Sequence, residues 1–88
     1  MKLKEDFLLR QVAGTWVVMP VGQATVDFNG MLTLNESGAL LWRKLSEGAD
    51  LDGLVAALTA EYNVSAEEAR ADAAAFCRKL LDAGCAEA

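Results

Sequence analysis

MLTLNESGALLW, residues 31–42, contains the change of hydrophobic pattern that decides the fold. Up to Leu34 the residues follow the two-residue period of a strand. After it, small and apolar residues recur at the three- and four-residue spacing of one helix face: Gly38, Leu41, Trp42 and Leu45. Asn35 stands between the two patterns and is a favoured N-cap residue. The stretch predicts a strand over residues 31–34 that runs directly into a helix.

The residues before this stretch have the pattern of a β-hairpin. Residues 7–12 and 15–20 are short runs rich in aromatic and β-branched residues, and Ala13-Gly14 between them suits a tight reversal. Pro20 lacks a backbone donor, so it ends the second strand or lies at a sheet edge. Asn29-Gly30 is a strong reversal signal just before the third strand. We therefore predict a three-stranded antiparallel sheet in the first part of the chain.

Two further helices follow, each with its own start signal. Asp50 can cap the first of them. Its apolar residues form one stripe: Leu51, Leu54, Val55, Leu58 and Tyr62. Ser65 and Glu68 have the spacing of a capping box, and the helix that they begin extends to the stop residue Gly84. The predicted fold class is α+β, a three-stranded antiparallel sheet followed by three helices, in a winged-helix-like single domain over residues 1–88.

Composition and charge restrict the classes of function. Apolar residues make up 53% of the sequence and charged residues 24%, so the chain is globular rather than disordered. The formal net charge of -5 disfavours nucleic acid, because affinity for phosphate backbones comes mainly from Lys and Arg. No apolar run approaches the roughly 20 residues that span a bilayer. The first six residues carry acids where a signal peptide would become apolar. We expect a cytoplasmic protein without a membrane segment.

The residue types that usually carry catalysis or bind metals are scarce. The chain has no histidine, its acids fall on predicted solvated faces or in loops, and its glycines do not follow a phosphate-loop spacing. The two cysteines, Cys77 and Cys85, lie more than two helical turns apart, too far for a disulfide. We expect two reduced thiols, with Cys77 near the core. The sequence predicts no enzyme, no metal site and no cofactor.

The last predicted helix has more apolar width than a small core needs. One stripe consists of Ala69, Ala73, Phe76 and Leu80, and a second flank beside it of Ala74, Cys77 and Leu81. The second flank can line a groove for a ligand, or it can belong to the core or to a dimer interface. The pattern alone leaves these alternatives open.

The junction resembles the PqqD family. Members carry a strand that ends in Pro, then a Met-x-x-Leu-Asn strand end that runs into a helix with a small residue and an aromatic residue. Here the corresponding residues are Pro20, then residues 31–39 and Trp42, and the resemblance covers nearly the whole chain. It implies a peptide-recognition module, often called a RiPP recognition element. Such a module binds the leader segment of a ribosomally made precursor peptide and presents it to a modifying enzyme, commonly a radical S-adenosylmethionine (SAM) protein.

The resemblance also implies where the peptide would bind. In the family the leader adds as a strand to the exposed edge of the third strand and packs against the last helix. The corresponding residues here are Met31, Leu32, Thr33, Leu34, Arg70, Ala74, Cys77, Arg78 and Leu81. Alternation indicates that Leu32 and Leu34 face the core while Met31 and Thr33 point away. Small Ala74 and Cys77 would leave space for leader side chains, and the two arginines could meet acidic residues of a leader.

The resemblance does not extend to one pathway, and two alternative functions stay open. The segment between Pro20 and Met31 is longer than in members built for pyrroloquinoline quinone synthesis, so the resemblance does not extend to that pathway. A winged-helix regulator that binds DNA is one alternative, but it needs a basic recognition helix, and here Glu67, Glu68 and Asp72 stand at the start of the last helix. The other alternative is a structural subunit whose apolar flank is covered by a second copy in a homodimer.

Overall fold

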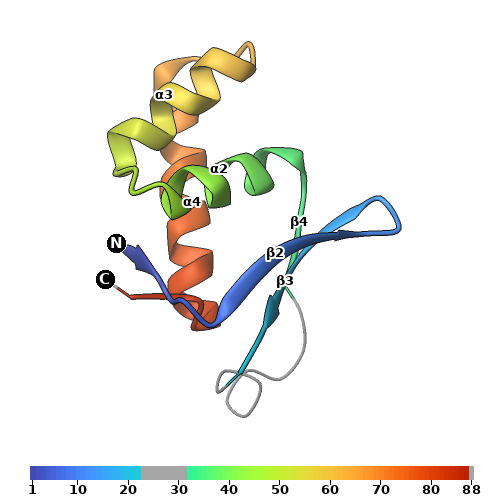
Figure 1. Cartoon of the computed structure of the whole chain (residues 1–88). Coiled ribbons are helices and arrows are strands. Elements are labelled where there is room, and N and C mark those ends of the chain that lie inside the picture. Colours follow the sequence, from blue (N-terminus) through green and yellow to red (C-terminus); the bar gives the residue numbers. More distant parts are fainter. Residues whose placement is uncertain (23–31, 88) are drawn as a thin grey trace.

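The computed structural model describes residues 1–22 and 32–87 and arranges them as strands followed by helices (Figure 1). The elements in chain order are β1 (Lys2–Leu3), β2 (Phe7–Val12), β3 (Thr15–Pro20), β4 (Leu32–Leu34), α2 (Glu36–Ser46), α3 (Leu51–Glu61), α4 (Ala66–Ala83) and β5 (Ala86–Glu87). The predicted α+β class is confirmed, and the predicted strands and helices match β2 to α4 within one or two residues. Met31, predicted to begin the third strand, and the Asn29-Gly30 reversal lie outside the described residues.

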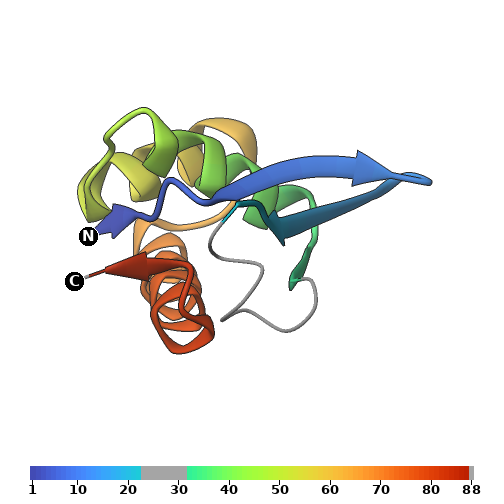
Figure 2. The same cartoon turned by 60° about the horizontal axis from the view of Figure 1, so that its bottom comes forward.

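Strands β2, β3 and β4 form an antiparallel sheet in that order. β2 and β3 pair along their whole length, and Figure 2 shows their hairpin extending away from the helices. Ala13 and Gly14 at its tip have φ values of 52° and 82°, as a two-residue reversal between twisted strands requires. Leu34 pairs with Trp16 and Leu32 with Val18. Because β3 is the central strand, β4 is an edge of this sheet.

A second, two-stranded sheet joins the two ends of the described chain, and the sequence analysis missed it. Leu3 of β1 pairs with Ala86 of β5, and the Lys4 N–H donates to the Cys85 carbonyl at 3.0 Å. Strands of two residues are too short to show alternation, so their pairing depends on tertiary packing. This pairing buries Cys85 completely, with 0% exposure. Cys85, more than the half-buried Cys77, is therefore the core thiol, and both cysteines are free.

The helix starts follow the predicted capping residues. The side-chain oxygens of Asn35, Asp50 and Ser65 accept from the third backbone N–H beyond each of them, at 2.8, 2.9 and 3.1 Å. Such caps stabilise a helix by about 1 kcal/mol each. At the Ser65 cap the hydroxyl also donates to the Glu68 carboxylate at 3.4 Å. α4 ends at Gly84 with φ of 82°, where a Schellman arrangement satisfies its last carbonyl groups.

The core lies between the inner face of the sheet and the three described helices (Figures 1 and 2). The predicted stripe of α4 is buried throughout: Ala69, Ala73, Phe76 and Leu80. Two of its members are alanines with 0% exposure, which allows α3 to pack closely against α4. In β4, Leu34 is buried, Leu32 is half-buried against the core and Thr33 is exposed, so the predicted alternation is confirmed. The end of β4 comes close to α4 at Gly38, where a Cβ would lie against both Leu34 and Phe76.

None of the helices in the described residues is long and apolar enough to cross a membrane. Nor do the His, Cys, Asp and Glu side chains of these residues form a group of three or more that could hold a metal ion.

Candidate functional site

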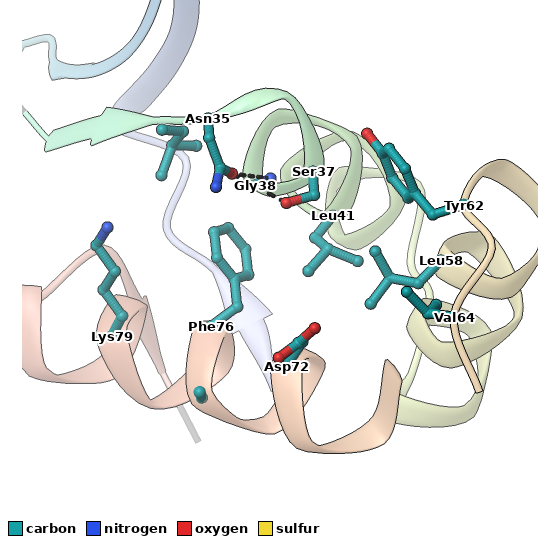
Figure 3. A pocket seen from close by; sticks show the side chains of 12 residues that line it. Asn35, Ser37, Gly38, Leu41, Leu58, Tyr62, Val64, Asp72, Phe76 and Lys79 are labelled. Carbon is teal, nitrogen blue, oxygen red and sulfur yellow. Dashed lines mark hydrogen bonds between the residues drawn. The ribbon is translucent and has the colours of Figure 1, made fainter. Parts of the chain in front are cut away.

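A groove opens where the end of β4 meets the helices (Figure 3). Its volume is about 570 Å³, and α2, α4 and the region around the end of α3 contribute to its walls. The lining residues are Leu34, Asn35, Ser37, Gly38, Leu41, Leu58, Tyr62, Val64, Asp72, Ala75, Phe76 and Lys79. Most of this surface is apolar, and the residues on α4 that face it are Asp72, Ala75, Phe76 and Lys79. The groove is of a size that accepts side chains of a ligand.

The floor of the groove is built around the Phe76 ring. Leu34, Leu41 and Leu58, which are buried, complete it. Gly38 on α2 faces the ring: a Cβ at this position would lie 3.3 Å from Phe76 Cε1 and 3.2 Å from Leu34 Cβ. A larger residue would therefore push the ring outward or separate α2 from β4. This explains the small residue at the start of the helix in the junction motif.

Polar groups lie at the rim, and the first of them is Asn35. Its Oδ1 accepts from the Gly38 N–H at 2.8 Å and from the Ser37 hydroxyl at 3.0 Å. The hydrogen-bond network assigns the amide this way round, so the Nδ2 group is left as a donor directed into the groove (Figure 3). Asp72 and Lys79 are the charged residues of the lining, and both are exposed.

The free edge of β4 continues into this groove. Among the described residues β4 pairs with β3 on one side and with no strand on the other. Leu34 is both the last residue of β4 and a lining residue of the groove. An extended chain that paired with the free edge would therefore pass over Phe76. This is the geometry of strand addition beside a side-chain pocket.

The structure separates the two halves of the site predicted from the sequence. Four of the predicted helix residues line a second hollow of about 590 Å³ together with Met1, Leu45 and the α2–α3 connection: Ala74, Cys77, Arg78 and Leu81. Arg70, the fifth, forms an ion pair with Asp52 of α3. At about 100° per residue, this flank of α4 lies about half a turn from the flank that carries Asp72 and Lys79. Leu32, Thr33 and Leu34 are in β4 as predicted.

This separation has a physical cause. The buried stripe of α4 has a flank on each side, and its periodicity does not tell which flank will face β4, because that depends on how the helix packs on the sheet. The family resemblance and the extra apolar width of α4 favour the flank with Ala74 and Cys77. The signal on the other flank was Asp72, Phe76 and Lys79, three residues of different chemistry on one face. Asn35 was recognised as a cap but missed as a groove residue.

The thiol on the second flank has little nucleophilic character. Burial raises the pKa of the Cys77 thiol above its ordinary value, although the nearby charged N-terminus acts in the opposite direction. Burial likewise raises the pKa of the Cys85 thiol, against the smaller opposite effect of Lys4. Both thiols are therefore held in the protonated form, which is neither a good nucleophile nor a good metal ligand.

Comparison with known proteins agrees with this architecture. Two solved structures share the fold, each with a TM-score of 0.81 and 99% of this chain covered. One is TbiB1 in complex with the TbiA(beta) leader peptide, 24% identical, with 95% of that chain covered. The other is lasso peptide synthetase B1 complexed with the leader peptide, 25% identical, with 96% covered. No match was found among curated proteins.

The family assignment comes from the sequence itself. The family model described as coenzyme PQQ synthesis protein D (PqqD) matches residues 15–86, which include β3, the β4–α2 junction, all three described helices and the start of β5. The match confirms the resemblance seen in the junction motif: the chain belongs to the PqqD family.

Proposed function

We propose that this protein binds the leader segment of a ribosomally synthesised precursor peptide along the free edge of β4 and in the adjoining groove. The observation that carries the proposal is the continuity of the two: Leu34 ends a strand edge that no other described strand pairs with, and it also lines the groove. Family membership supports it, and so do the two solved structures of the same fold, each determined with a leader peptide.

In strand addition, backbone hydrogen bonds and side-chain contacts would have separate roles. The outward backbone groups of β4 would pair with the leader backbone, which fixes its position without reading its sequence. Alternate leader side chains would then point toward α4 and lie over Phe76. Burial of one apolar side chain there contributes about 1.5–3 kcal/mol. The proposed site consists of Leu32, Thr33 and Leu34 with Asn35, and of Asp72, Ala75, Phe76 and Lys79; Met31 precedes it in the chain.

We infer that the protein acts as an adaptor for an enzyme rather than as an enzyme. Among the described residues its groove combines an apolar floor with one amide, two hydroxyls, one carboxylate and one ammonium group, and burial raises the pKa of both thiols. The chemical step would then belong to a partner, and the family resemblance suggests a radical SAM enzyme that acts on the peptide in the cytoplasm. The acids in the first turn of α4 and the net charge of -5 argue against DNA as the ligand.

The test is an amide NMR and hydrogen-exchange titration of the labelled protein with leaders of short peptides encoded near its gene. Strand addition is expected to protect the β4 amides that point away from β3 and to shift the signals of Asn35, Gly38 and Phe76. A scrambled leader of the same composition should produce neither effect. Perturbation without new protection in β4 would contradict strand addition, and no response to any leader would contradict peptide binding. A measurement of the molecular mass of the free protein in solution tests the alternative, a homodimer in which a second copy already pairs with the β4 edge.

A further inference from the structure

The groove holds two charges of opposite sign that have no ion-pair partner among the described residues. Lys79 and Asp72 both project from the groove flank of α4 (Figure 3). The ion pairs of the described chain, Arg70 with Asp52 and Lys44 with Glu47, involve neither of them. A charge left open beside an apolar floor is available to a ligand. These two residues therefore give the groove a positive end and a negative end.

The Lys79 end of the groove offers hydrogen-bond donors. Figure 3 shows the Lys79 side chain directed toward the end of β4, on the side where Asn35 lies. Both hydrogen bonds of Asn35 engage its Oδ1, so its Nδ2 group has no partner among the described residues. An ammonium and an amide N–H₂ together complement a carboxylate, which only accepts.

The other end has the opposite character. The Asp72 carboxylate lies beyond Phe76 as seen from Lys79, close to Leu41 and Leu58 (Figure 3). Among the described residues Lys79 is the only cation that lines the groove. A carboxylate in this position favours a basic side chain of a ligand. The apolar floor between the two ends favours an apolar side chain.

The spacing of the two charges fits an extended peptide. Seven residues separate Asp72 from Lys79, which is about 10.5 Å along a helix. An extended chain advances about 3.4 Å per residue, and every second side chain points to the same side. Side chains two or four positions apart are thus about 6.8 or 13.6 Å apart along the peptide. The lengths of these side chains and of the Lys79 side chain make up the difference from the separation of about 10.5 Å along α4.

We propose that the groove selects leader segments in which an acidic side chain at the Lys79–Asn35 end and a basic side chain at the Asp72 end flank an apolar one. This inference rests on the proposed function, because it specifies which leaders the groove accepts. Lys79 and Asp72 are then specificity-determining residues, and the apolar floor supplies most of the affinity.

The experiment is selection from a library of displayed random 12-residue peptides. The baits are the unaltered protein, Lys79→Glu and Asp72→Lys. Arg78→Glu is the matched control, because it makes the same change of charge one residue away on the other flank of α4. All three substituted positions are exposed, so the variants should fold, which circular dichroism checks. Affinities of the enriched peptides are then measured by fluorescence anisotropy.

The expected result is a consensus with an acid and a base on either side of an apolar residue. Lys79→Glu should replace the acid by a base, Asp72→Lys should replace the base by an acid, and Arg78→Glu should leave the consensus unchanged. Each reversal should weaken the original peptides about threefold or more. Enriched peptides whose charges do not respond to either variant would overturn this inference while leaving the proposed function in place. Failure to enrich any peptide would overturn both.

Discussion

Ala75→Arg and Ala74→Arg form a matched pair that decides which flank of α4 contacts a leader. Ala75 lines the groove beside Phe76, whereas Ala74 lines the second hollow. Both alanines are exposed and both lie within α4. Each substitution adds the same volume and one positive charge, and arginine is almost as good a helix former as alanine. A difference in affinity between the two variants therefore reports position alone.

The size of the effect follows from the side chain that the arginine displaces. At position 75 it would occupy space in which a leader side chain lies over Phe76. Loss of that burial costs about 1.5–3 kcal/mol, which corresponds to about a tenfold to hundredfold rise in Kd. At position 74 we expect a change of about twofold or less. Neither variant should alter the free energy of unfolding by more than about 0.5 kcal/mol.

The assay is fluorescence anisotropy with a labelled leader, combined with thermal melts of both variants. Measuring at low and moderate salt separates the added charge from the added volume, because only the former is screened. A larger loss of affinity for Ala74→Arg than for Ala75→Arg would refute the groove assignment and favour the Cys77 flank. Small and equal effects would refute binding on either flank of α4.

Three further predictions concern the stability of the fold. Asn35→Ala removes the α2 cap, so it should cost about 1 kcal/mol and lower Tm by about 4–8 °C, whereas Asn35→Asp keeps the cap; an unchanged Tm for the alanine variant would argue against the cap. Ala13→Gly should raise the free energy of unfolding by up to about 1 kcal/mol in urea titrations, since glycine tolerates positive φ; a loss of stability would contradict this. Because burial raises the pKa of both thiols, the folded state keeps their protons to higher pH than the unfolded state does. Stability should therefore be level below the ordinary thiol pKa and fall as pH rises above it, and Cys77→Ala with Cys85→Ala should reduce that fall; a rise in stability toward alkaline pH would be inconsistent with buried thiols.

The order of elements was predictable because each one carries its own local signal. The period of two changes to 3.6 at Asn35, the caps Asp50 and Ser65 mark the other helix starts, and Gly84 marks the last stop. The β1–β5 pair was not predictable, because two-residue strands have no period and depend on contacts between the chain ends. Local patterns determine where elements begin and end, whereas pairing between distant segments such as β1 and β5 depends on tertiary contacts.

The candidate site shows the same division. The strand edge was predictable, because the third strand of a three-stranded sheet that follows a hairpin must lie at an edge. The pattern does not determine which flank of α4 faces β4, because α4 has apolar residues on both sides of its buried stripe. Gly38 indicates which side of α4 faces the groove, because its position against Phe76 and Leu34 connects the junction motif to that side of α4. A small residue in a helix start can thus identify the face that a distant helix presents.

The shortness of β4 constrains how the proposed function would work. The three described residues of β4 offer few backbone hydrogen bonds, each with a net value of about 0.5–1.5 kcal/mol. A short edge also limits pairing with other copies of the chain. Side chains in the groove must therefore provide most of the affinity and all of the selectivity for a leader. A moderate affinity is sufficient if the same protein also contacts the modifying enzyme, because tethering raises the local concentration of the peptide to about the millimolar range. On this argument, a leader whose apolar anchor is removed loses modification even when its backbone can still pair with β4.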